Sequence, residues 1–89
     1  MKNTDFILVE DSITDAHMIK RIVEQQEIAD DYLWLKDGEE ALAYFESFNV
    51  EKPCLVLLDI NLPKFSGFEV LEQLRENEKT KHVPVVVSS

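Results

Sequence analysis

Three features are scarce in this sequence, and each absence excludes a class of protein. The single cysteine, Cys54, cannot form an internal disulfide, which is typical of reducing compartments. Only 9 basic residues stand against 18 acidic ones, and the formal net charge of −9 argues against nucleic acid, whose phosphates attract Lys and Arg. No apolar run approaches the ~18 residues of a membrane-spanning helix, and the first residues do not resemble a secretory signal. We therefore expect a cytoplasmic protein that binds neither nucleic acid nor membrane through this chain.

The chain of 89 residues has room for one domain, so we treat residues 1–89 as one unit. Short apolar runs, which suit buried strands, alternate with segments whose apolar residues recur at helical spacing. The predicted strands are 6–9, 31–35, 54–58 and 85–89, and the predicted helices are 12–26, 37–48 and 66–77. The order βαβαβαβ, with strands that are apolar throughout, predicts an α/β fold with a parallel sheet covered on both faces.

Two of the predicted helices begin with the pattern of a capping box, in which a Ser side chain and an acid three residues later satisfy each other's backbone. These pairs are Ser12 with Asp15 and Ser66 with Glu69. Helical spacing also predicts which side chains face the core. The expected core-facing residues are Ala16, Ile19, Ile22 and Val23 in the first helix, and Phe68, Leu71 and Leu74 in the third.

Acidic residues follow two of the predicted strands. Glu10 and Asp11 come directly after the first strand, and Asp59 ends the apolar run of the third. Parallel strands end at the same edge of a sheet, where open α/β folds bind ligands. Two carboxylates ~4 Å apart repel each other by roughly 4 kcal/mol at an effective dielectric constant of ~20. Such a cluster has raised pKa values or binds a cation, and hard oxygen ligands favour Mg²⁺.

Each of these acids also has an ordinary explanation when it is considered alone. Asp11 could cap the first helix, although Ser12 can already fill that role. Glu10 could be a solvated acid, and Asp59 could be a turn residue before the Leu-Pro pair at 62–63. The predicted meeting of all three at one edge favours a functional site.

Three segments resemble the receiver domain of two-component response regulators. "ILVEDS" is similar to the first strand and acidic pair of that family, "LLDINLPKFSG" to its phosphoacceptor strand and loop, and "VPVVVSS" to its fourth strand. The resemblance covers the whole chain. It implies a flavodoxin-like, doubly wound parallel sheet with the strand order 2-1-3-4-5.

The resemblance also implies a role for individual residues. Asp59 would accept a phosphoryl group from a sensor histidine kinase or a phosphotransfer protein. Glu10, Asp11 and Asp59 would hold Mg²⁺ together with the backbone carbonyl of Asn61, and the hydroxyl of Ser88 would contact the phosphoryl oxygens. "VEDS", "NLPK" and "VPVVVSS" further resemble small stand-alone regulators that are paired with phytochrome-type kinases.

Part of the family pattern has no counterpart in these 89 residues. The family's lysine after a fifth strand, that strand itself and the last two helices are missing, so we expect residues 1–89 to be the N-terminal portion of a receiver domain. The run from Pro84 to Ser89 would then be an apolar sheet edge. We expect such a chain to form a homodimer, to exchange segments, to recruit the missing part or to aggregate.

Other functions are compatible with parts of this pattern. A phosphatase of the haloacid dehalogenase class also uses an Asp after an apolar strand, but it needs a second acid where this chain has Asn61. A receiver-like interaction module that is never phosphorylated, or a Mg²⁺ site without chemistry, would keep the same acids. His17 and His82 are expected on a helix surface and in a loop, and we assign neither a role.

Overall fold

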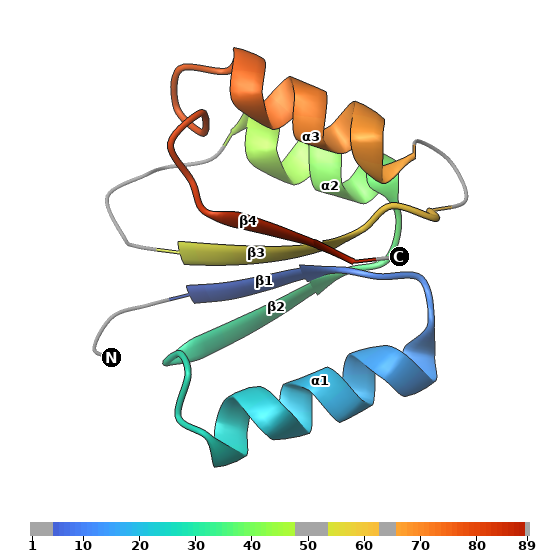
Figure 1. The fold of residues 1–89 in the computed structure, drawn as a ribbon, viewed down its shortest axis with the longest axis vertical. Coiled ribbons are helices and arrows are strands. Elements are labelled where there is room, and N and C mark those ends of the chain that lie inside the picture. The colour runs from blue at the N-terminus through green and yellow to red at the C-terminus, as the bar shows by residue number, and fades with distance from the viewer. Residues whose placement is uncertain (1–4, 48–53, 63–65, 89) are drawn as a thin grey trace.

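The protein is an α/β sandwich in the computed structural model, which describes residues 5–47, 54–62 and 66–88. Its four strands and three helices alternate along the chain (Figure 1). They are β1 (Asp5–Val9), α1 (Ile13–Gln25), β2 (Asp31–Leu35), α2 (Gly38–Glu46), β3 (Cys54–Asp59), α3 (Gly67–Glu76) and β4 (Val85–Ser88). All neighbouring strands are parallel and their order is β2-β1-β3-β4, which confirms the predicted fold class.

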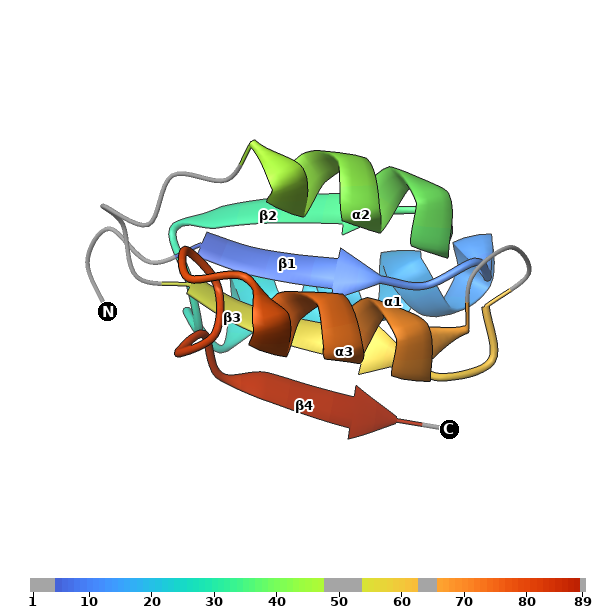
Figure 2. The ribbon, with the colours of Figure 1, turned by 90° about the horizontal axis from the view of Figure 1, so that it is seen from above.

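Helices cover both faces of this sheet. Helices α2 and α3 lie on one face and α1 lies on the other, as Figures 1 and 2 show. The strand side chains alternate between two apolar clusters, because successive residues of a strand point to opposite faces. In β1, Ile7 and Val9 belong to the cluster under α2 and α3, whereas Phe6 and Leu8 pack with α1. The continuous apolar run of β1 is therefore buried on both sides.

The predicted capping box is complete at the start of α3, and at the start of α1 only the bond to the Ser12 side chain is described. At Ser66 the expected capping box is present in full, since the Ser66 side chain accepts from the Glu69 N–H and the Glu69 side chain accepts from the Ser66 N–H. At Ser12 the side chain accepts from the Asp15 N–H at 3.2 Å. The Ser12 N–H, however, donates to Oε2 of Glu10 at 3.2 Å. The start of α1 is thus connected to one of the acids of the predicted site.

Two side chains that we expected in the core are exposed. Ile22 is 46% exposed and Phe68 is 63% exposed. The residues that α1 buries are Ala16 and Val23, and those that α3 buries include Gly67, Val70 and Leu74. Ile22 and Phe68 each lie one position from a buried residue, which turns them about 100° around the helix, away from the sheet. The predicted ends of α2 at residue 48 and of β4 at residue 89 fall outside the described residues.

Strand β4 has one neighbour, β3, in the described sheet. Its Val86 and Val87 are 53% and 42% exposed, on opposite faces. Self-association of the chain through this strand stays a prediction. Among the described residues, no helix has the length and apolar character that crossing a membrane requires.

Candidate functional site

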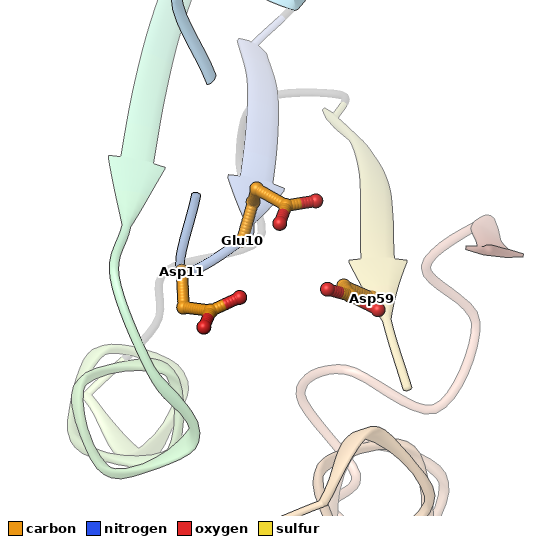
Figure 3. Close-up of side chains that lie close together, drawn as sticks. All are labelled: Glu10, Asp11 and Asp59. Carbon is orange, nitrogen blue, oxygen red and sulfur yellow. The ribbon is translucent and has the colours of Figure 1, made fainter. Parts of the chain in front are cut away.

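The three acids predicted to converge do lie together. Strands β1 and β3 are direct neighbours with Val9 opposite Leu58, so the residues that follow, Glu10 and Asp59, are adjacent at the carboxyl edge of the sheet. Asp11 comes next in the chain, and one carboxylate oxygen from each of the three acids lies within 4.8 Å of the others. Figure 3 shows the three carboxylates turned toward a common space between the ends of β1 and β3. The parallel arrangement of the strands is what brings them together.

The three carboxylates differ in their surroundings. Glu10 is only 8% exposed, whereas Asp59 is half-buried and Asp11 is exposed. Burial raises the pKa of Glu10, and the negative charges of Asp59 and Asp15 raise it further, while the hydrogen bond from the Ser12 N–H acts in the opposite direction. A buried acid beside two others is a place of concentrated negative potential, which a cation would relieve.

Asp59 is held by the strand that carries it and by the turn that follows. Asp59 lies opposite Ser88 in the pairing of β3 with β4, and the next residue, Ile60, donates its N–H to the Ser88 carbonyl at 3.0 Å. The Asn61 N–H donates to Oδ1 of Asp59 at 3.0 Å. This bond, from the turn that follows Asp59, orients the carboxylate. The preceding residues of β3 fix the backbone of Asp59 in the sheet.

Gly67 lets the start of α3 approach the backbone beside Asp59. Its N–H donates to the Ile60 carbonyl at 3.0 Å. A Cβ atom at this position would lie 2.3 Å from the Ile60 Cα and 2.5 Å from the Asp59 carbonyl oxygen, closer than real Cβ atoms come to other atoms. Only glycine fits here without displacing the end of β3.

Sequence reasoning missed one residue of this edge, Trp34. Its indole Nε1–H donates to the backbone carbonyl of Glu10 at 2.6 Å. A tryptophan in a predicted apolar strand is normally assigned to packing, and the sequence carries no signal for this contact. The register of β2 against β1, with Trp34 opposite Leu8, is what places the indole within reach of Glu10.

Of the residues with expected roles, the structure brings the three acids into one cluster and places the others beside Asp59 through backbone contacts. Glu10, Asp11 and Asp59 form one cluster. Ser88 is paired with Asp59 across β3 and β4, and the Asn61 N–H donates to the Asp59 carboxylate. Pro63, in the expected Leu-Pro turn, lies outside the described residues. His17 and His82 are exposed on α1 and in the loop before β4, as expected. Cys54 is buried, and burial raises the pKa of its thiol.

The donor set suits a hard divalent cation. Three carboxylates supply oxygen ligands and negative charge, and their uneven burial leaves one side open for water or phosphate oxygens. A soft metal would call for sulfur or imidazole ligands. Neither Cys54 nor the two histidines are members of the cluster.

A hollow of about 450 Å³ lies elsewhere on the molecule, between the last turns of α2 and α3. It is lined by Leu42, Ala43, Phe45, Glu46, Gln73, Leu74, Asn77 and Thr80. Because α2 and α3 begin at the carboxyl edge of the sheet, this hollow lies at the opposite end of the helices from the acids. Its lining offers a single carboxylate, so the chemistry-bearing groups remain those of the acidic edge.

Comparison with known proteins adds independent information. A family model described as "Response regulator receiver domain" matches residues 6–89. Response regulator Rcp1 of Synechocystis sp. is 39% identical in an alignment of 85 residues, which covers 91% of this chain and 58% of that protein. The Mn²⁺-bound form of Rcp1 superimposes with a TM-score of 0.81 at 36% identity, over 93% of this chain and 63% of that one. The phosphorylated cyanobacterial phytochrome response regulator RcpA gives a TM-score of 0.83 at 35% identity, over 98% of this chain and 64% of that one.

Coverage of these relatives is partial. The chain spans between 58% and 64% of the length of Rcp1 and RcpA in these three comparisons. The similarity therefore covers only a part of each relative, and it does not by itself extend the functions of the whole relatives to this chain.

Proposed function

Because this chain belongs to the response regulator receiver domain family, we propose that it accepts a phosphoryl group on Asp59 from a histidine kinase or a phosphotransfer protein. One observation carries the proposal. The carboxylates of Glu10, Asp11 and Asp59 share one edge of the sheet, and Ser88 lies opposite Asp59 in the neighbouring strand. A nucleophile, a cation site and a hydroxyl are the groups that phosphoryl transfer to a carboxylate needs.

Asp59 is the nucleophile in this mechanism. One of its carboxylate oxygens attacks the phosphorus of a phosphohistidine, an O–P bond forms, the N–P bond breaks, and the imidazole of the donor leaves with the electron pair. The Asn61 N–H on Oδ1 holds the carboxylate in one orientation during the attack. The exposed half of Asp59 gives the donor access, while buried β3 prevents the backbone from yielding.

Glu10, Asp11 and Asp59, with the backbone carbonyl of Asn61, are the residues that we propose would hold Mg²⁺. A bound divalent cation would neutralise the charge that develops on the phosphoryl oxygens in the transition state. The three carboxylates concentrate negative potential at this point, so they repel an incoming phosphoryl group unless that charge is balanced. We therefore expect phosphorylation to require a divalent cation.

Ser88 would receive the product. Its hydroxyl is on the strand next to Asp59, and the phosphoryl group adds about −1.5 to −2 charges and three acceptor oxygens at this edge. A hydrogen bond from the Ser88 hydroxyl to one of those oxygens would pull the end of β4 toward the site. Such a shift can convert a local charge change into a change of surface, and hydrolysis would reverse it.

The partner is inferred from relatives. Rcp1 and RcpA are response regulators, and RcpA is described as a phytochrome response regulator. We extend this to a phytochrome-type kinase as the phosphoryl donor. The acidic surface of this chain, with its net charge of −9, suits a donor with basic residues around its histidine.

Phosphoryl uptake by the full-length protein tests this function. Incubation with acetyl phosphate and Mg²⁺ should add the mass of one phosphoryl group to the wild type and to Glu72→Gln, a control that removes an exposed carboxylate from α3. Asp59→Asn should gain nothing, because an amide is not nucleophilic, and EDTA should block the wild type. A folded wild-type protein that binds Mg²⁺ but gains no mass would instead favour an interaction module that is never phosphorylated.

A further inference from the structure

We propose that Trp34 is a positioning residue for the acidic site, which it serves by holding the backbone of Glu10 through its indole N–H. The inference rests on the proposed Mg²⁺ site and names a residue that the family resemblance does not supply. It starts from the 2.6 Å bond between Trp34 Nε1 and the Glu10 carbonyl oxygen.

Glu10 lies just beyond the last residue of β1, where the sheet no longer constrains the chain fully. Its backbone N–H still reaches β2, donating to the Leu35 carbonyl at 3.0 Å. Strand β2 itself ends at Leu35, and the next N–H, that of Lys36, donates to the Glu40 side chain at 2.8 Å. The Trp34 indole supplies the donor for the Glu10 carbonyl. Both backbone groups of Glu10 are thereby bonded to β2, one through main chain and one through a side chain.

Fixing the backbone of Glu10 fixes the direction of its carboxylate. The side chain is 8% exposed, and Oε2 accepts from the Ser12 N–H. Burial limits the rotamers that the side chain can adopt, so its direction follows the backbone. A carboxylate that is held in the direction of Asp59 and Asp11 keeps the three ligand oxygens together. Outer partners that orient ligands in this way contribute strongly to metal affinity.

Trp34 is itself held firmly enough to act as an anchor. It is half-buried in the cluster under α1, and the ring of His17 in α1 meets it edge-on with centroids 6.4 Å apart. An indole N–H in such a place needs an acceptor, because an unpaired buried donor is costly. The contact therefore connects α1, β2 and the first acid of the site.

The chain offers a matched control on the same strand. Tyr32, two residues earlier on the same face, donates its hydroxyl to the Ala16 carbonyl in α1 at 2.8 Å. Tyr32→Phe therefore removes one hydrogen bond from a β2 aromatic ring to a backbone carbonyl, as Trp34→Phe does. The two differ in that the Tyr32 bond ends on α1 and the Trp34 bond ends on Glu10.

The test measures Mg²⁺ affinity by calorimetry and unfolding by urea in the full-length protein. Trp34→Phe should weaken Mg²⁺ binding by roughly threefold to tenfold, because this factor in the dissociation constant corresponds to the net free energy of one hydrogen bond. Tyr32→Phe and Trp34→Phe should lower the urea midpoint to a similar extent. Tyr32→Phe, however, should leave Mg²⁺ affinity within error of the wild type. Replacement of Trp34 by β-(3-benzothienyl)alanine, which keeps the bicyclic shape and has sulfur in place of N–H, should reproduce the loss without a cavity.

Each other result overturns a specific statement. If Trp34→Phe and the sulfur analogue bind Mg²⁺ as the wild type does, or if Tyr32→Phe weakens binding equally, Trp34 has no positioning role. A folded wild-type protein that binds no Mg²⁺ would overturn the proposed metal site, and this inference with it. The two failures are thus distinguished by the wild-type titration alone.

Discussion

Glu10 and Asp59, although 49 positions apart in the sequence, end neighbouring strands and place carboxylate oxygens within 4.8 Å of each other. The charge of Asp59 is one of the causes that raise the pKa of Glu10, after burial. Without a cation the folded state therefore contains an electrostatic repulsion that the unfolded chain lacks. Removal of one charge, protonation and metal binding should each relieve it, and each can be measured.

Asp59→Asn should raise the stability of the metal-free protein. The amide has nearly the shape of the carboxylate and still accepts the Asn61 N–H through its oxygen. We expect a gain of roughly 1–2 kcal/mol in the free energy of unfolding, less than the ~4 kcal/mol of a pair at ~4 Å, because Asp59 is half-exposed and screened by solvent. Urea unfolding in EDTA measures this, with Glu72→Gln as the control for loss of a distant charge. Equal gains in both variants would contradict a local repulsion.

The stability of the metal-free protein should also decrease as the pH rises, because of Glu10. In the folded state its pKa is raised above the ordinary value of 4.5, by burial first and then by the charges of Asp59 and Asp15. The folded protein therefore binds this proton more tightly than the unfolded chain, and stability is lost as pH rises from about 4.5 through the raised pKa. Glu10→Gln, which cannot titrate, should not show this loss. Parallel curves of unfolding free energy against pH for the two proteins, measured in EDTA, would refute the assignment.

Asp11→Ala should weaken Mg²⁺ binding on the order of tenfold, because affinity for a hard cation depends on the number of charged oxygen ligands. Titration of Mg²⁺ can be followed by Trp34 fluorescence, since the indole is bonded to the backbone of Glu10. Glu24→Ala is the matched control and should leave the affinity unchanged, since Glu24 is an exposed acid of α1 outside the cluster. Equal affinities for wild type and Asp11→Ala would remove Asp11 from the site.

Gly67→Ala should damage the fold and the site together. The added Cβ would lie 2.3 Å from the Ile60 Cα and 2.5 Å from the Asp59 carbonyl oxygen, both of them backbone atoms that cannot swing aside. We expect a loss of roughly 1–3 kcal/mol in unfolding free energy, accompanied by weaker Mg²⁺ binding.

Ser66→Ala controls for destabilisation at the same end of α3. It removes the helix cap, at a cost of about 1 kcal/mol, and adds no atom near Asp59. Its Mg²⁺ affinity should equal that of the wild type. A Gly67→Ala variant with unchanged Mg²⁺ affinity would indicate that the close approach matters for stability alone.

Glu27→Gly should stabilise the protein by about 0.5–1 kcal/mol. Glu27 follows α1 with φ of 51°, in the left-handed region that costs a side chain energy, while the Ile28 N–H bonds back to the Val23 carbonyl at 3.0 Å. Glycine removes that cost, partly offset by its freedom in the unfolded chain. Gln26→Gly, at φ of −92°, is the control and should bring no gain. Thermal and urea unfolding measure both.

The sequence by itself determined the order and type of the elements. Apolar runs such as Cys54–Leu58 are too short for helices, and Ser66 with Glu69 signals a helix start from residues three apart. Local spacing carries this information because strands and helices have fixed periods. That Glu10, Asp11 and Asp59 lie at one edge of the sheet was also predictable from the parallel direction of the strands, and their contact follows because β1 and β3 are neighbours.

Only the tertiary structure decided what depends on register and on close approach. The bond from Trp34 to Glu10 exists because β2 pairs with β1 with Trp34 opposite Leu8, and no local pattern specifies that pairing. The exposure of Phe68 depends on how α3 is rotated against the sheet, and the need for glycine at 67 depends on the backbone of Ile60 across the turn. Contacts between distant segments are fixed by the packing of whole elements, and that packing is a property of the folded chain.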